Sequence, residues 1–386
     1  MDKKQFLYKY QKITDWLVSC LVKNILCRKE LYSFVKGSNL RLGKLPGEHK
    51  WKEKWSVLIP NTNLDYYRFY SLYTGENINL CPDDVMHNVI TPILNPKRYI
   101  STYKDKCMFD LFLDRTFGRR ITPQTIIRNI DGTCYGENYE TLSKTEVEKI
   151  LKTCTFDRIV IKPSVDSSSG NSIVFGVKAK DQNIFYTKEG QIVDYNYLLN
   201  IYRKNYVVQR AVNQNSFMAQ FCCSSINTIR MLVYRSVVDN QPHVLNAFMR
   251  IGKEGSLVDN IHAGGTFLGI NSNGQLCDFC IGTNSNKMSK FNGIDFSTQR
   301  FVIPNYENLK DFACKVSESM PHMHLFSLDV MINENNEPLL IEYNLQGFGV
   351  RGYQFTSGPA LGEFTDEIIN YCREHRDMAT RVFISF

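Results

Sequence analysis

The sequence predicts an α+β protein of two or three domains, and three observations support this class. The chain has 386 residues, which is too many for one ordinary hydrophobic core. Its first part has helical periodicity, whereas short helices and strands alternate from about residue 103. Longer strands separated by turn residues follow after residue 210. We therefore expect an accessory domain over residues 1–102 and mixed α and β structure beyond it.

The amino-terminal segment carries the chain's positive charge. Residues 1–60 contain thirteen Lys or Arg and five Asp or Glu, and the whole chain has a formal net charge of +7. Apolar residues recur at helical spacing over residues 3–36, and Gly37 is a plausible helix end. Such a basic helix can lie on a membrane or contact another anionic partner, or it can pack on its own protein with its charges solvated. We predict no particular fold for residues 37–100.

The sequence argues against an exported, a membrane-spanning or a nucleic-acid-binding protein. The start of the chain is not a signal peptide, so we expect a cytoplasmic protein whose twelve cysteines are reduced. Cys277 and Cys280 form a single CxxC pair, which favours buried thiols over a metal site. The longest apolar stretch is too short to span a bilayer. No nucleic-acid-binding motif accompanies the basic segment, and the sequence does not indicate an oligomeric state.

The alternation after residue 103 gives the expected elements. Before residue 210 we expect two helices, one that begins near Asp105 and one over 144–153. In the same part we expect four strands, which lie within 121–127, 156–162, 173–177 and 206–209. Beyond residue 210 we expect strands over 227–234, 243–250, 324–332 and 338–344, and a helix over 305–319. Asn273-Gly274 is typical of a hairpin turn.

The strongest functional pattern is Asp329 with Glu342 and Asn344. Glu342 and Asn344 are two residues apart on one expected strand, so their side chains share a face. A hairpin can place Asp329 beside them, and oxygen ligands of this kind suit Mg²⁺ bound near phosphates. The alternative is the polar face of an antiparallel hairpin. The apolar neighbours of these residues weaken it, because carboxylates within such strands need a partner.

A second pattern joins Lys162, at the end of a strand, to a polar loop. The lysine can place a point charge beside a phosphate. The Ser and Gly residues of the loop can donate hydrogen bonds to phosphate oxygens. These loop residues are Ser167, Ser168, Ser169 and Gly170. The alternative is an ordinary hairpin loop. No Walker sequence is present.

Arginines on strands and one glycine-containing loop complete the candidates. Arg230, Arg250 and, in the Gly-rich tail, Arg351 can bind carboxylates or phosphates, or they can form structural ion pairs. The loop can cover a substrate, and its candidate residues are Asp259, Asn260, His262, Gly264 and Gly265. His262 alone is weak evidence for a general base.

These stretches occur in the order and spacing of the ATP-grasp superfamily. More narrowly, residues 103–370 resemble the sugar-transfer-associated ATP-grasp proteins encoded with surface-polysaccharide genes. The similarity rests on Ile159-Val-Ile-Lys-Pro-Ser164, Asn227-Thr-Ile-Arg230, Met249-Arg-Ile-Gly252, Val258-Asp-Asn260 with Gly264-Gly265, Leu328-Asp-Val330, Leu340-Ile-Glu-Tyr-Asn344 and the tail 347–362.

The resemblance implies an ATP-grasp fold with two α+β lobes that sandwich ATP, a smaller lobe over 103–208 and a larger lobe over 209–386. Lys106 and Lys162 match the two nucleotide-binding lysines of the smaller lobe. The strand that contacts adenine through its backbone matches Gln209, Arg210, Ala211 and Val212. The metal ligands match Asp329, Glu342 and Asn344. Some relatives carry an arginine where this chain has Ser327, so Arg230 or Arg250 would have to supply that charge.

The resemblance also implies the reaction. With ATP and Mg²⁺, a carboxylate would form an acyl phosphate that an amine then attacks, with Arg230, Arg250 and Lys162 as the catalytic residues. Family context suggests a uronic acid, nucleotide-linked or lipid-linked, joined to an amino acid or amine in capsule or other surface-polysaccharide biosynthesis. A kinase that phosphorylates a hydroxyl group and a non-catalytic nucleotide-binding protein remain alternatives.

Overall fold

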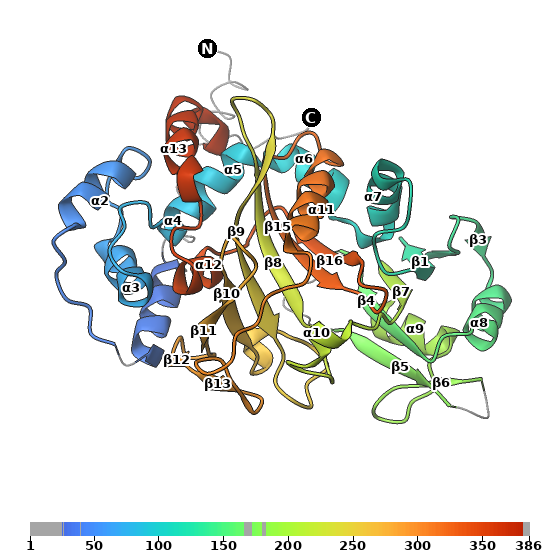
Figure 1. The fold of residues 1–386 in the computed structure, drawn as a ribbon. Coiled ribbons are helices and arrows are strands. Elements are labelled where there is room, and N and C mark those ends of the chain that lie inside the picture. Colours follow the sequence, from blue (N-terminus) through green and yellow to red (C-terminus); the bar gives the residue numbers. More distant parts are fainter. Residues whose placement is uncertain (1–24, 26, 39, 166–171, 180–182, 381–386) are drawn as a thin grey trace, which may run out of the picture. The chain divides into compact units, whose positions relative to one another are not determined.

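The computed structural model describes residue 25 and residues 27–38, 40–165, 172–179 and 183–380. The chain forms two compact units (Figure 1). The first draws on Met1–Ile100, Phe217–Val330 and Glu342–Phe386, and the second on Ser101–Ser216 and Met331–Ile341. Each unit is built around an antiparallel sheet with helices, which confirms the mixed α and β class. The domain boundaries proposed from the sequence stay a prediction.

The sheet that belongs mainly to the first unit carries the longest strands. Its order is β12 (Lys287–Met288), β11 (Leu276–Ile281), β10 (Thr266–Ile270), β9 (Pro242–Ile251), β8 (Thr228–Arg235), β15 (Leu325–Ile332) and β16 (Pro338–Asn344). All eight residues of β15 are buried, so a polar residue on that strand needs a partner inside the protein. The expected strands over 227–234, 243–250, 324–332 and 338–344 are confirmed within two residues. A small separate sheet pairs β13 (Lys290–Phe291) with β14 (Ile294–Asp295).

Residues 37–100, for which the sequence predicted no fold, are largely helical. Trp51 and Trp55 of α2 are fully buried, and their indole nitrogens donate to the carbonyl oxygens of Leu80 and Ile78. A helix over residues 27–38 leads into this segment. The elements that follow are α2 (Glu48–Ser56), α3 (Leu64–Thr74), α4 (Asp83–Val85), the π-helix η1 (Met86–Ile90), α5 (Thr91–Leu94) and α6 (Lys97–Lys104). The expected helix over 3–36 is seen only from residue 25 onward, because residues 1–24 and 26 lie outside the described residues.

The remaining helices of the first unit surround its core. They are α10 (Ser216–Ala219), η3 (Ile261–Ala263), α11 (Tyr306–Glu318), α12 (Arg351–Thr356), η4 (Gly362–Phe364), α13 (Thr365–Glu374) and η5 (Arg376–Thr380). A single apolar cluster joins α2, α3 and η1 to sheet residues such as Leu232 and to α12 and α13. The accessory segment therefore shares a core with the sheet rather than forming a core of its own.

The second unit has a sheet in the order β3 (Thr141–Leu142), β2 (Thr133–Tyr135), β1 (Thr125–Ile130), β7 (Tyr206–Arg210), β4 (Arg158–Pro163), β5 (Val174–Lys178) and β6 (Phe185–Tyr186). Its helices are η2 (Lys106–Met108), α7 (Phe109–Phe117), α8 (Lys144–Thr153) and α9 (Tyr195–Tyr202). The predicted helix over 144–153 is confirmed, and a capping box of Ser143 and Glu146 fixes its start.

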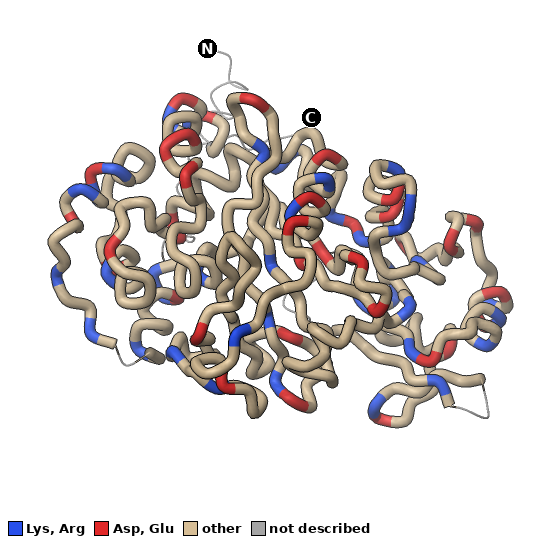
Figure 2. Tube along the Cα trace, in the orientation of Figure 1, with Lys and Arg blue, Asp and Glu red and all other residues tan. Residues whose placement is uncertain are grey.

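Charges of both signs lie along the amino-terminal elements, with basic residues in the majority. Figure 2 shows Lys and Arg interspersed with Asp and Glu over residues 27–38 and α2. Within the part of the chain that the structure describes, no helix is long and apolar enough to cross a membrane.

Candidate functional site

A cluster of four charged side chains lies in the first unit, three on strands of the sheet and one in the loop after β9. Arg230 of β8 pairs in register with Asp329 of β15, and its Nε and Nη2 atoms each donate to one carboxylate oxygen at 2.7 Å. Arg250 of β9 lies in register with Thr228 of β8. Its Nη1 atom donates to Asp329 at 3.1 Å. The three strands lie side by side in the sheet (Figure 1), which brings residues 99 positions apart into contact.

Asp259 continues the cluster on its other side. One carboxylate oxygen lies 2.9 Å from Nη2 of Arg250, and the other accepts the backbone N–H of Thr228 at 3.1 Å and its hydroxyl. Asp259 is therefore held by groups of its own chain. Thr228, which the sequence did not single out, supplies two of those contacts. Both arginines form the ion pairs that the sequence left as the alternative to ligand binding.

Burial makes these charges depend on one another. Burial raises the pKa of Asp329, but the positive charges of Arg230 and Arg250 outweigh it and hold that pKa below its ordinary value. Burial also raises the pKa of Asp259, and Arg250 and Thr228 only partly offset it. Burial would lower the pKa of Arg230, whereas Asp329 raises it above its usual range. Asp329 is thus the more firmly ionised of the two carboxylates.

The predicted metal ligands lie on β15 and β16, which are neighbours in the sheet. The Asn344 side chain donates to the backbone oxygen of Ser327 at 3.4 Å, two residues before Asp329. Asp329, Glu342 and Asn344 offer oxygen donors from adjacent strands, and this chemistry fits a hard divalent cation. No cluster of three or more His, Cys, Asp or Glu side chains suited to a metal occurs among the described residues, and the predicted set has two carboxylates and one amide.

The loop after β9 is held by its own side chains. The side-chain oxygen of Asn260 accepts the backbone N–H of His262 at 3.2 Å and caps η3, while the His262 side chain is exposed. Gly264 has a φ of 90°, which favours glycine. A Cβ atom on Gly265 would lie 2.7 Å from the carbonyl oxygen of Asp259, so only glycine fits there. Among the five predicted loop residues, Asp259 forms an ion pair with Arg250 of the charged cluster.

Arg351 lies elsewhere in the first unit. Its guanidinium bonds Asp83 at 3.3 Å and Glu30 at 2.7 Å, and it stacks over the ring of Phe34 at 4.4 Å. No local sequence pattern indicates these partners, because Asp83 is 268 residues away. Ser327 is fully buried, and its hydroxyl lies 3.1 Å from the hydroxyl of Tyr353.

The second unit carries the predicted nucleotide-binding residues. The backbone N–H of Lys106 donates to Ser164, which places Lys106 beside the end of the strand that bears Lys162. Gln209 is buried on β7 and its amide donates to the Thr125 hydroxyl at 3.0 Å. Arg210 lies 3.7 Å from Glu334, and Ala211 and Val212 follow half-buried. Ser167, Ser168, Ser169 and Gly170 lie outside the described residues.

Comparison with known proteins gave one family and several distant structures. A model of the family described as sugar-transfer associated ATP-grasp matches residues 94–370. An N5-carboxyaminoimidazole synthetase from Staphylococcus aureus, complexed with ADP, aligns with 68% of this chain and 52% of its own, at 11% identity and a TM-score of 0.38. The structure of the ATP-grasp ligase PsnB complexed with its minimal precursor aligns with 72% of this chain and 64% of its own, at 11% identity and a TM-score of 0.39.

A third structure, N5-carboxyaminoimidazole ribonucleotide synthetase from Thermotoga maritima, aligns with 68% of this chain and 49% of its own, at 10% identity and a TM-score of 0.35. The chain thus spans less than two thirds of the length of each of these three proteins. No curated protein gave a match.

Proposed function

The chain belongs to the sugar-transfer associated ATP-grasp family, and we propose that it uses ATP and Mg²⁺ to join a carboxylate to an amine through an acyl phosphate. The observation that carries this proposal is the pairing of Arg230 and Arg250 with Asp329, on the strand next to Glu342 and Asn344. Positive side chains and oxygen donors on neighbouring strands suit a reaction in which negative charge moves between phosphate and carboxylate oxygens.

Each group has a role in this proposal. Asp329, Glu342 and Asn344 would hold Mg²⁺, which when bound neutralises phosphate charge. Lys106 and Lys162 would bind phosphate oxygens, and the backbone of residues 209–212 would contact adenine. The loop residues 167–170 would donate further hydrogen bonds to phosphates.

Arg230 and Arg250 would orient the substrate carboxylate and offset the charge that develops on it. Two carboxylates hold Arg250 from either side, and this leaves its guanidinium little freedom to rotate. A preorganised cation of this kind stabilises a transition state without reorganising during the reaction. The loop 259–265 would lie over the substrate and exclude water from the acyl phosphate.

The family's association with sugar transfer supports a proposed substrate class. A sugar carboxylate, as in a uronic acid linked to a nucleotide or a lipid, would be the acceptor of the phosphoryl group, and an amino acid or simple amine would attack it. We propose that the product is an amide on a surface-polysaccharide precursor.

The test is the release of ADP and phosphate from Mg·ATP with panels of nucleotide-linked uronic acids and amines. Glu342→Gln removes one metal ligand, and Glu363→Gln is the matched control, because Glu363 is exposed on η4. We expect release that needs both substrates, persists in Glu363→Gln and is lost in Glu342→Gln. If ADP were released with a hydroxyl substrate and no amine, the protein would be a kinase rather than a ligase. If ADP release were unchanged in Glu342→Gln, Glu342 would not be a metal ligand.

A further inference from the structure

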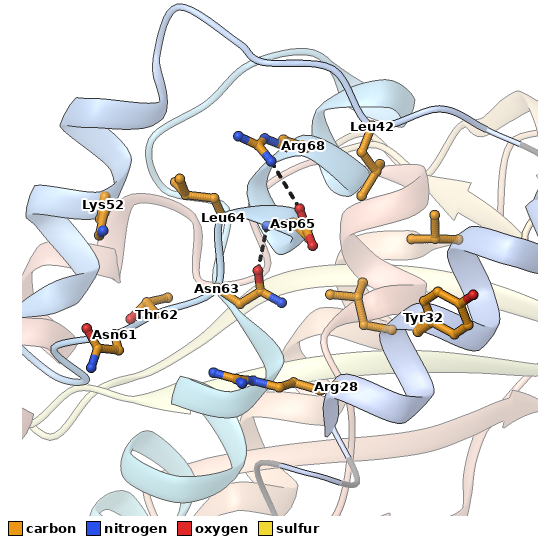
Figure 3. Close-up of a pocket in the computed structure, with 12 residues that line it drawn as sticks. Arg28, Tyr32, Leu42, Lys52, Asn61, Thr62, Asn63, Leu64, Asp65 and Arg68 are labelled. Carbon is orange, nitrogen blue, oxygen red and sulfur yellow. Dashed lines mark hydrogen bonds and ion pairs between the residues drawn. The ribbon is translucent and has the colours of Figure 1, made fainter.

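A separate concavity lies in the first unit, and residues 28–68 alone build it. Its volume is about 660 Å³ (Figure 3). The family model begins at residue 94, so every residue of this pocket precedes the matched segment. The four charged residues of the cluster on β8, β9 and β15 are not among those that line it.

One wall of the pocket is a single face of the amino-terminal helix. Arg28, Leu31, Tyr32 and Val35 are spaced by three and four residues, which places them on one side of the helix. Leu31 is buried, but the side chain of Tyr32 is 70% exposed although it is large and aromatic. This wall therefore offers apolar surface to a ligand.

The charges of the pocket are unbalanced. Arg68 is neutralised, because it bonds both oxygens of Glu48 at 2.7 and 3.0 Å and lies 3.2 Å from Asp65. Arg28 and Lys52 both line the cavity, and neither is in direct ion-pair contact with a described carboxylate, although the charge of Arg28 also acts on the buried Asp84. In Figure 3 the guanidinium of Arg28 points toward the turn at Asn61–Asn63. An anion seated there would meet two cations from two different helices.

We propose that this pocket binds a phosphorylated amphiphile, with its phosphate or diphosphate near Arg28 and Lys52 and its apolar chain along Leu31, Tyr32 and Val35. Arg and Lys suit a multiply charged phosphate, because one forms bidentate bonds and the other supplies a compact charge. The apolar wall favours a ligand that carries an apolar chain beside its charged group. The site does not depend on the proposed ligase reaction, because none of its residues takes part in it.

The test is binding of monomeric decyl phosphate, measured by calorimetry at a concentration where it does not form micelles. Inorganic phosphate and decyl maltoside, which lack one half of the ligand each, are the comparison probes. We expect decyl phosphate to bind at least about tenfold more tightly than either. Arg28→Ala and Lys52→Ala should each weaken binding by about tenfold, whereas Lys50→Ala, which removes the same charge from α2 outside the pocket, should not.

Three outcomes would overturn the proposal. If inorganic phosphate bound as tightly as decyl phosphate, the apolar wall would contribute nothing to binding. If Lys50→Ala and Lys52→Ala weakened binding equally, the effect would come from net charge rather than from the pocket. Binding to vesicles of anionic phospholipid without binding of the monomer would make the region a membrane-adsorbing surface rather than a pocket. Tyr32→Ser gives an independent check, since it should weaken decyl phosphate and leave inorganic phosphate unchanged, and thermal unfolding would verify that each variant is folded.

Discussion

Asp84 is a buried carboxylate, and we predict that Asp84→Asn stabilises the protein above pH 6. The residue is the second of α4 and is 7% exposed. Burial is the main reason that its pKa rises from 3.8 to about 6, and Asp83 contributes in the same direction. The backbone N–H of Val85, which donates to Asp84 at 2.9 Å, and the charge of Arg28 oppose the rise.

The sign of the effect follows from proton binding. Between pH 3.8 and about 6 the folded chain holds a proton at Asp84 that the unfolded chain has released, so the free energy of unfolding decreases as the pH rises. Above pH 6 both states are ionised and the penalty is constant. The difference between the two pKa values corresponds to about 3 kcal/mol, the upper bound on what Asp84→Asn can recover.

Urea unfolding of wild type and Asp84→Asn between pH 4 and pH 8 measures this difference. Asparagine retains an oxygen for the N–H of Val85, so the variant removes the charge and keeps the hydrogen bond. We expect a gain below about 1 kcal/mol at pH 4 that grows to about 3 kcal/mol at pH 8. Asp278→Asn, at an exposed position on β11, should show no such trend. A gain that does not change with pH, or a loss at pH 8, would refute the reasoning.

Three further variants test other parts of the fold. Asn95→Ala should lower the free energy of unfolding, measured in urea, by about 3–5 kcal/mol. The reason is that the buried amide donates to the carbonyl oxygens of Leu325 and Leu345 and accepts from the backbone N–H groups of His324 and Leu325. A loss under about 1 kcal/mol would contradict this. Gly265→Ala should lower the melting temperature, since its Cβ would meet backbone oxygens at 2.7–2.9 Å, whereas Gly43→Ala meets open space and should not. Asp259→Asn should reduce the rate of ADP release roughly tenfold or more by freeing Arg250, while an unchanged rate would show that Asp259 does not position it.

The sequence predicted the strands around the charged cluster because their pattern is local. Residues 338–344 form β16 over the predicted range, and residues 324–332 differ from β15 by one residue. Both are apolar runs bounded by polar turn residues, so neighbours in the sequence suffice to identify them. The pairing of Arg230 with Asp329 could not be predicted in this way, since it depends on the register between β8 and β15.

The amino-terminal part was missed for a related reason. Residues 37–100 have no long period because their buried faces contact distant segments as well as one another. The ring of Tyr73 packs on Phe355 with centroids 4.4 Å apart, and Asn95 bonds strand residues about 230 positions away. Such contacts are set by tertiary structure, which overrides weak local preference. The partners of Arg351 were invisible for the same reason.

Arg230→Lys would separate the structural and catalytic roles of the cluster. Arg230, Arg250, Asp259 and Asp329 balance one another, and an unpaired buried charge costs about 3–5 kcal/mol. Arg230→Ala would therefore lose stability whatever its role in catalysis, whereas lysine keeps the charge and gives up the two parallel bonds to Asp329. We expect Arg230→Lys to unfold within about 2 kcal/mol of wild type yet to release ADP at least about tenfold more slowly. Normal turnover would show that Arg230 is needed only to balance Asp329.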